Sequence, residues 1–214
     1  MGTLRGLLGG GLFIFNAVIF SAAPLEAQTA ALCEREMSRA AKKYGVPLGI
    51  LFAVGLTETG IDGHLHAYAL NLEGNTVYSL GKAQAIERFN AAKAAGMKLI
   101  DVGCMQLNYY FHGEHFSSIG DMLDPQKNVD YAARFLSDLK LREGSWTMAA
   151  ARYNAGKNND PAQKRYVCRV LSRLVESGFG AWTASSSAFC QGEVPAVRVP
   201  KSLGHGSNSL AQVH

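Results

Sequence analysis

Apolar and polar positions along the chain predict a mainly helical protein. Apolar side chains recur at helical spacing over residues 30–44, and Gly45 ends that pattern. The next segment, 47–60, is apolar nearly all round, which predicts a buried helix that begins at a proline. Further helices are predicted over about 82–95, 125–143 and 146–156, and from 160 onward.

One segment, 61–82, breaks the helical pattern. Its Asn-Leu-Glu-Gly-Asn stretch is a turn signal, and residues 76–78 (Thr-Val-Tyr) form a short strand candidate. After Gly178 the composition shifts to Ser, Gly and Pro, and a flexible tail is expected from about residue 191. The fold class expected is therefore mainly α, with about six helices, at most one short β-hairpin and a flexible C-terminal tail.

The N-terminal segment is typical of a secretory signal peptide. Arg5 precedes an uncharged run over residues 6–20, and small residues follow, with cleavage expected after Ala27 and Ala23 or Ala30 as alternatives. A retained membrane anchor is the other interpretation, but a bilayer span needs about 20 apolar residues and this run is shorter. The predicted organisation is a signal peptide over 1–27, one domain over 28–180 and a C-terminal extension over 181–214.

Composition narrows the class of protein. The 214 residues are 48% hydrophobic and 18% charged, which excludes a wholly disordered or fibrous chain. The length suits one domain with terminal extensions. The net charge of +4 is spread without a long basic run, so we expect no nucleic-acid partner. The protein is also expected to be a monomer.

Glu58 is the first candidate for chemistry. Leu51, Val54 and Glu58 lie on one helical face, which places a carboxyl group beside core-facing residues. Burial and the C-terminal end of a helix both raise the pKa of a carboxyl group, and a protonated acid can protonate a leaving group. The alternative is a hydrated surface Glu at a helix end, which is the commoner situation.

Three segments in order favour the catalytic interpretation. GLTETG (55–60), DVGCMQLN (101–108) and ARYNAG (151–156) together resemble the motifs of the soluble lytic transglycosylase family, which are lysozyme-like enzymes that cleave peptidoglycan. The resemblance covers about residues 31–175. Thr59 stands where the family has Ser, Cys104 where it has Leu, and Arg152 precedes the Tyr. The Asp-Val-Gly-Cys variant is most similar to a small branch associated with flagella, type III or type IV secretion and conjugation.

The resemblance implies a lysozyme-like helical domain with Glu58 as its sole catalytic acid/base. It implies that a sugar-binding groove is lined by Gln106, Tyr153 and Asn154. Thr59, which keeps the family's hydroxyl, and Tyr166, which is expected near the acid, are further substrate-binding residues. Amide side chains and a Tyr suit sugar hydroxyl and N-acetyl groups. From the residues alone, Asn154 is equally a helix end, Tyr153 a core aromatic and Gln106 a loop residue bonded to backbone.

The implied reaction needs one carboxyl group, whereas most glycosidases use two. Glu58 protonates the glycosidic oxygen between N-acetylmuramic acid and N-acetylglucosamine, and then takes the proton of the muramyl 6-hydroxyl as a 1,6-anhydro ring closes. Asp62, Glu73 and Asp101 lie nearby in sequence, and turn bonding is the expected role of Asp62 and Asp101. The resemblance implies a periplasmic enzyme without cofactor that acts on peptidoglycan glycan strands, with components of a flagellar, type III, type IV or conjugation apparatus as candidate partners.

Four cysteines, an even number in an exported chain, predict two disulfides. Three pairings are possible, and we expect Cys33–Cys104 and Cys168–Cys190. The first bond would join the N-terminal helix to the segment carrying Gln106, and the second would hold the C-terminal stretch on the last helix. A single bond with Cys104 as a buried free thiol is the alternative.

Other chemistry is also compatible with the sequence. His64 and His66, with His112 and His115, offer imidazoles for zinc, although Gly113 indicates a loop where a helical zinc motif would be needed. Cys104 with His112 or His115 could form a cysteine nucleophile if the thiol were free. A sugar-binding module without catalysis is a further alternative, against which the presence of Glu58 argues. We expect no metal site.

Overall fold

The protein is mainly α-helical, as the sequence predicts. A computed structural model describes residues 25–60, 63–156 and 159–194. Its helices are α1 (Leu25–Tyr44), α2 (Leu48–Thr59), α3 (Lys82–Ala94), α4 (Tyr109–His112), α5 (Ile119–Met122), α6 (Pro125–Glu143), α7 (Trp146–Asn154), α8 (Asp160–Glu176) and α9 (Ala184–Phe189), with a 3-10 turn η1 (Gly113–His115). Its strands are β1 (Ala69–Leu72), β2 (Asn75–Tyr78), β3 (Ile100–Val102) and β4 (Leu107–Asn108).

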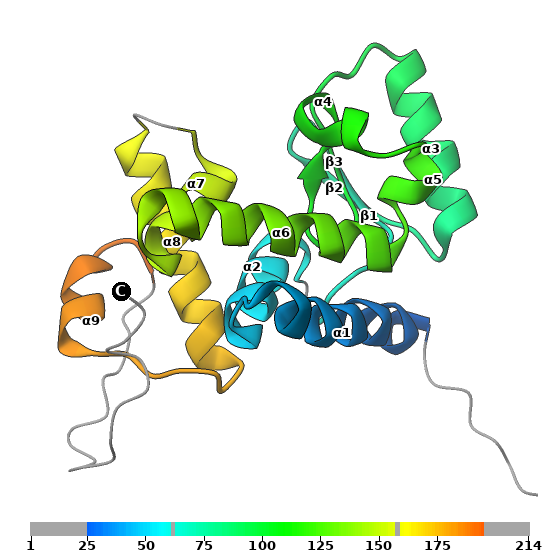
Figure 1. Ribbon diagram of the computed structural model, residues 1–214. Helices are drawn as coiled ribbons and strands as arrows, with labels where there is room; N and C mark the ends of the chain where they lie inside the picture. The colour runs from blue at the N-terminus through cyan, green and yellow to red at the C-terminus, as the bar shows by residue number, and fades with distance from the viewer. Residues whose placement is uncertain (1–24, 61–62, 157–158, 195–214) are drawn as a thin grey trace, which may run out of the picture.

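Helix α6 crosses the molecule between two groups of elements (Figure 1). The sheet with α3, α4 and α5 lies at one end of α6, and α7, α8 and α9 lie at the other end. Helix α1 packs along α6, and α2 packs on both α1 and α8. The sheet group and the α7–α9 group are therefore joined through α6.

Local sequence signals explain the helix ends around α6. The Asp124 carboxylate accepts hydrogen bonds from the backbone N–H groups of Gln126 and Lys127 at 3.0 and 3.2 Å, and Pro125 follows as the first helical residue. Gly144, at a φ of 81°, ends the helix in the left-handed conformation. Ser145 then caps α7. The predicted helices over 125–143 and from 146 are confirmed.

The predicted hairpin is confirmed as β1 and β2, and two further strands extend it. The sheet has the order β2-β1-β3-β4, and all its pairs are antiparallel. The hairpin turn has Glu73 and Gly74 at φ values of 52° and 99°, and the Asn71 side chain accepts a hydrogen bond from the Gly74 N–H. Strands β3 and β4 were not expected, because runs of three and two residues carry no periodicity of their own.

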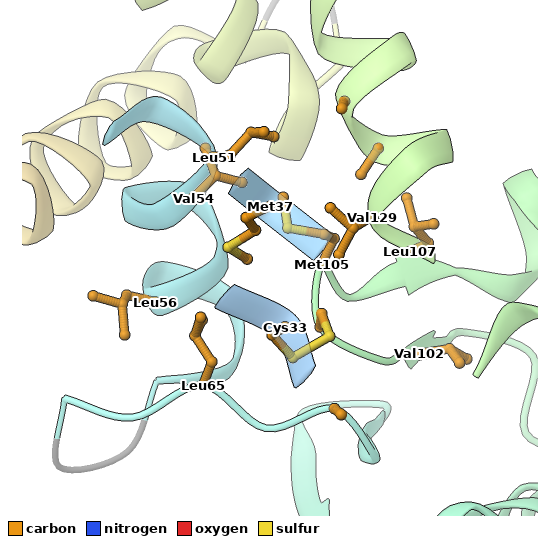
Figure 2. Packing of buried hydrophobic residues seen from close by; sticks show 14 of the residues in the cluster. Cys33, Met37, Leu51, Val54, Leu56, Leu65, Val102, Met105, Leu107 and Val129 are labelled. Atoms are coloured by element: carbon orange, nitrogen blue, oxygen red, sulfur yellow. A yellow bond between two sulfur atoms is a disulfide. The ribbon is translucent and has the colours of Figure 1, made fainter. Parts of the chain in front are cut away.

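The core lies where α1, α2 and the segment after β3 meet (Figure 2). Met37, Leu51, Val54 and Met105 have no exposed surface there. Asn128 of α6 is equally buried, and its side chain binds the segment after β3. The core therefore fixes the end of α2 and residues 103–106 relative to each other.

Two disulfides with the expected pairing are present. Cys33 of α1 is bonded to Cys104, with 5.7 Å between the Cα atoms, and this bond is drawn in Figure 2. Cys168 of α8 is bonded to Cys190, at the end of α9, with 5.5 Å between the Cα atoms. Cys104 is therefore not a free thiol, which removes the cysteine-nucleophile alternative.

The predicted boundaries of the signal peptide and of the C-terminal tail can be compared with the described residues only in part. Helix α1 begins at Leu25, so the expected cleavage after Ala27 falls within its first turn. Residues 1–24 of the predicted signal peptide and residues 195–214 of the predicted tail lie outside the described residues. Among the helices that are described, none combines the length and apolar character that a membrane span requires.

Candidate active site

Glu58 lies in the last turn of α2, and the fold holds that turn in place. A Cβ added at Gly55 would lie 2.4 Å from the Met37 side chain, 3.0 Å from Leu65 and 3.6 Å from the backbone oxygen of Cys104. A larger residue at position 55 would require the Met37 and Leu65 side chains to shift. The end of α2 is therefore seated against α1 and against the segment that follows β3.

Tyr166 of α8 contacts Glu58 directly. Its hydroxyl donates a hydrogen bond of 2.6 Å to Oε1 of Glu58, and its side chain is almost fully buried, at 1% exposure. Burial and the neighbouring Glu58 raise the pKa of the Tyr166 hydroxyl well above its ordinary value. Tyr166 is therefore a fixed hydrogen-bond donor that orients the carboxyl group.

The environment makes Glu58 a weak acid for a carboxyl group. Burial raises its pKa to about 7, the hydrogen bond from Tyr166 opposes that rise, the charge of Asp101 adds to it and the charge of Arg169 opposes it. Protonated and ionised forms are thus both populated near neutral pH. A single group with this pKa can act first as a general acid and then as a general base.

The segment 103–106 packs against α2 at Gly55, one turn before Glu58. Gly103 has a φ of 78° and Gln106 one of 44°, an uncommon conformation for a residue with a side chain. The Gln106 amide nitrogen donates to the carbonyl oxygens of Ala69 and Gly103, at 3.1 and 3.0 Å. Its Oε1 atom is buried and has no hydrogen-bond partner within the described part of the chain. The side chain of Gln106 is therefore held in place by backbone groups.

Tyr153 links α7 to the segment 103–106. Its hydroxyl donates a hydrogen bond of 2.7 Å to the carbonyl oxygen of Met105, and its ring remains half-buried. Burial, followed by the charges of Glu58 and Asp101, raises the pKa of Tyr153 well above its usual value. The charge of Glu58 therefore acts on the Tyr153 hydroxyl. Tyr153 is a half-buried tyrosine that lies between the core and the surface.

The other two predicted residues occupy different surroundings. Thr59 is 1% exposed; its hydroxyl donates to the Gly55 carbonyl oxygen at 3.1 Å and accepts from the His66 N–H at 3.4 Å. It therefore links the end of α2 to the following loop. Asn154 is exposed at the last position of α7, next to Tyr153. The structure thus brings Glu58 and Tyr166 into contact, turns Thr59 inward and leaves Asn154 open to solvent.

The sequence predicted that Asp101 bonds within a turn, but the residue lies in a strand. It lies in β3 opposite Asn108 of β4, whose side-chain amide donates a hydrogen bond of 2.7 Å to its Oδ1. Burial raises the pKa of Asp101. The sequence offered one usable signal, since Asp101 and Asn108 both lie in the DVGCMQLN segment, but their pairing depends on a strand register that the sequence does not reveal.

A row of aromatic and imidazole rings that sequence reasoning missed extends from Tyr153; all are half-buried except the exposed ring of His115. The Phe135 ring lies 5.8 Å from Tyr153 and 5.2 Å from His112, between ring centres. Nδ1 of His112 is hydrogen-bonded to the Tyr131 hydroxyl at 2.9 Å, and Tyr131 stacks on His115. Burial lowers the pKa of His112. The rings come from three separate segments, so no local motif could identify them.

The remaining features do not compete with this site. No group of three or more His, Cys, Asp or Glu side chains is arranged to hold a metal ion in the ranges that the structure describes. A cavity of about 320 Å³ lies between α7, α8 and α9, with Ile50 at the other end of α2 from Glu58 in its lining. This apolar cavity does not include the carboxyl group.

Comparison with known proteins gives one match. The family model described as Transglycosylase SLT domain matches residues 36–173, a range that includes Glu58, segment 103–106, Tyr153 and Tyr166. Comparisons with curated proteins and with solved structures gave no match.

Proposed function

Because the chain belongs to the transglycosylase SLT family, we propose that its site performs the lytic transglycosylase reaction on peptidoglycan. In this proposal Glu58 is the sole catalytic acid/base. The observation that carries this proposal is the hydrogen bond from Tyr166 to a Glu58 carboxyl whose pKa is raised to about 7. A pKa near the working pH lets one group give and then regain a proton.

In the first step, Glu58 acts as a general acid. Its proton passes to the oxygen of the β-1,4 bond between N-acetylmuramic acid and N-acetylglucosamine, and the bond from that oxygen to the muramyl C1 breaks. The positive charge that develops at C1 is stabilised by the substrate's own N-acetyl group. Tyr166 then donates its hydrogen bond to the newly formed carboxylate, which is the form that accepts it more strongly.

In the second step, the Glu58 carboxylate acts as a general base. It removes the proton of the muramyl 6-hydroxyl, whose oxygen bonds to C1 and closes the 1,6-anhydro ring. Glu58 regains its proton, and no water is consumed. Exclusion of water from C1 therefore decides between this product and the hydrolytic one.

The neighbouring polar groups suit the binding of an amino sugar. We assign Gln106, the half-buried ring of Tyr153 and the exposed amide of Asn154 to the lining of the sugar-binding groove. The role assigned to Thr59 is indirect, since its hydroxyl holds the end of α2.

The proposed location is the periplasm. Two disulfides favour an oxidising compartment, and the substrate of the family lies there. The similarity of the Asp-Val-Gly-Cys segment to the export-associated branch supports a role in opening the wall locally for a flagellar, type III, type IV or conjugation apparatus. The enzyme is proposed to act as a monomer without cofactor.

The test is mass spectrometry of the sugars released from purified peptidoglycan. The proposed reaction yields 1,6-anhydromuramyl products, which are lighter than the hydrolytic products by one water. Glu58→Gln should fold and release nothing, whereas Glu87→Gln, the same change at an exposed position of α3, should behave as wild type. Hydrolytic products would instead identify a lysozyme-type muramidase, and binding without release by the wild type would identify an inactive peptidoglycan-binding module.

A further inference from the structure

A second cavity lies where the row of rings that begins at Tyr153 ends, and the proposed reaction does not use it. Its volume is about 310 Å³, within the range that ligand pockets occupy. Tyr131 of α6, His115 of η1 and Phe116 belong to its lining. The rings of His115 and Phe116 lie 5.2 and 5.3 Å from the Tyr131 ring, between ring centres. We call this cavity the α6–η1 pocket.

Ring contacts connect the α6–η1 pocket with the candidate active site. The Phe135 ring lies 5.8 Å from that of Tyr153 and 6.4 Å from that of Tyr131, between ring centres. Tyr153 in turn is hydrogen-bonded to Met105 and is assigned above to the lining of the sugar-binding groove. Each of the three rings is half-buried and so retains exposed apolar surface, which can contact a sugar. A glycan strand that passes Tyr153 can therefore follow these rings to the pocket.

The charges of the pocket leave one cation available. Of the Lys and Arg side chains in the lining, Lys127 binds Asp121 at 2.8 Å, whereas Arg134 forms no ion pair with any of the described residues. The remaining carboxylate of the lining, Asp130, is held by two basic side chains of α1. Both carboxylates of the lining are thus already paired, and the Arg134 guanidinium is free to bind an anion.

Arg134 is also held in a suitable place for an anionic ligand. Its guanidinium lies over the Tyr131 ring, 5.5 Å from the ring centre, and such a contact orients the group without using its N–H donors. Glu114 and Asp138 also act electrostatically on Tyr131, but both are exposed and neither lines the pocket, so water screens them. A planar guanidinium with free donors matches the two oxygens of a carboxylate.

Resting on the proposed function, we propose that the α6–η1 pocket binds the stem peptide of a muramyl residue, with Arg134 pairing with a peptide carboxylate. In intact peptidoglycan the free carboxyl groups lie on the stem peptides, because the lactyl carboxyl group of each muramyl residue is bound in an amide. The anion that meets Arg134 therefore comes from the peptide and not from the sugar. The substrate of the enzyme is thus a glycan strand that still carries its peptides.

A comparison of two soluble substrates tests this inference in the full chain. One is uncross-linked glycan strands with their stem peptides, and the other is the same strands after conversion of their carboxyl groups to methylamides. Wild type should favour the first substrate in kcat/KM by roughly tenfold or more, as expected for hydrogen bonds to a charged group. The difference should lie mainly in KM, because the pocket holds the peptide equally before and during cleavage. Raising the ionic strength should reduce it.

Three variants assign the preference to Arg134. Arg134→Gln should bring the ratio of the two kcat/KM values close to one. Arg134→Lys keeps the charge without the planar fork and should retain part of the preference. Arg142→Gln makes the same change as Arg134→Gln at an exposed position of α6 outside the pocket, and its ratio should equal that of wild type. Positions 134 and 142 are both exposed, so all three variants should keep the melting temperature of wild type.

The inference is overturned if wild type cleaves both substrates equally well, or if Arg134→Gln keeps the wild-type ratio. Strands from which an amidase has removed the peptides provide a further test, because their lactyl carboxyl groups are free. If cleavage of these strands depends on Arg134 as strongly as cleavage of the intact strands does, the carboxylate belongs to the sugar and the inference is wrong.

Binding to Glu58→Gln separates this inference from the proposed function. The variant should bind intact strands about tenfold more tightly than methylamide strands, because binding in the pocket does not require bond cleavage. This preference, together with a wild type that releases no anhydro product, would remove the proposed function and keep the pocket. Anhydro products from wild type, without any preference in binding or turnover, would keep the proposed function and remove the pocket.

Discussion

The Tyr166 hydroxyl lies 2.6 Å from Oε1 of Glu58, and this hydrogen bond joins the middle of α8 to the last turn of α2. The two residues are far apart in sequence; Tyr166 is almost fully buried and Glu58 is half-buried. A donor fixed in this way stabilises the ionised carboxyl group more than the neutral one. The bond therefore moderates the effect of burial and keeps the pKa of Glu58 near 7.

Tyr166→Phe tests this bond without removing the ring. Loss of the donor should raise the pKa of Glu58 further, because the hydrogen bond from Tyr166 lowers it. The alkaline limb of kcat/KM should move to higher pH. Turnover should fall by about tenfold or more, since a hydrogen bond to a charged group contributes roughly 1.5–3 kcal/mol. Tyr44→Phe, at a half-buried tyrosine of α1, is a matched control that should leave the profile unchanged. A profile of Tyr166→Phe that coincides with wild type would contradict the assigned role.

Glu58 should also make the stability of the protein depend on pH. Its pKa is about 7 in the folded state and near the ordinary value of 4.5 when unfolded, so the folded state binds this proton more tightly. The stabilisation is fully present below about pH 4.5 and is lost as the pH rises through 7. Glu58→Gln does not titrate, so it should gain on wild type by on the order of 1–3 kcal/mol between pH 5 and pH 8.

Urea unfolding at several pH values measures this difference. Glu87→Gln, which changes an exposed carboxyl group, should keep a constant offset from wild type over the same range. A Glu58→Gln offset that does not change with pH would mean that the Glu58 carboxyl titrates in the folded protein as it does in the unfolded chain.

The sequence predicted those parts of the fold whose signals are local. Asp124 before Pro125 and Gly144 after the last turn bound α6, and the structure has the helix between them. The Asn71–Asn75 turn predicted the hairpin for the same reason. Strands β3 and β4 escaped prediction because β3 forms by pairing with the distant strand β1, and β4 forms only by pairing with β3.

The same distinction holds for the site. Glu58 was predicted from its helical face and from the three motifs. Tyr166 was predicted only from the resemblance, because its contact with Glu58 joins α2 to α8. Asp101 was taken for a turn residue, because its place in β3 and its hydrogen bond with Asn108 depend on strand pairing. Thr59 was expected near the sugar, but its hydroxyl bonds to backbone groups within the fold. Local sequence does not fix which way such a side chain turns.

Asn128 should be essential to the geometry of the 103–106 segment. Its side chain accepts from the Met105 N–H at 3.0 Å and donates to the carbonyl oxygens of Val102 and Met122, both at 2.9 Å, with no exposed surface. Asn128→Asp leaves both carbonyl groups without their donor and buries a carboxyl group. We expect a loss of about 3–5 kcal/mol in the free energy of unfolding.

Asn90→Asp makes the same change at an exposed position of α3 and should cost less than about 0.5 kcal/mol. Urea unfolding of both variants gives the comparison. Equal stability of Asn128→Asp and Asn90→Asp would show that the buried amide is not required to hold the segment.

The two disulfides should differ in their effect on activity. Cys33–Cys104 spans 71 residues and Cys168–Cys190 spans 22, so chain entropy predicts contributions of roughly 4 and 3 kcal/mol. Cys104 immediately precedes Met105, whose carbonyl oxygen accepts the Tyr153 hydrogen bond, whereas Cys190 holds α9 against α8, away from Glu58.

Replacing Cys33 and Cys104 by Ala should therefore lower both the melting temperature and turnover. Replacing Cys168 and Cys190 should lower the melting temperature with little loss of turnover below it. The two double variants are matched controls for each other, and peptide mapping without reductant verifies the remaining bond in each. Equal loss of turnover in both variants at a temperature where both are folded would contradict a specific link between the first disulfide and the active site.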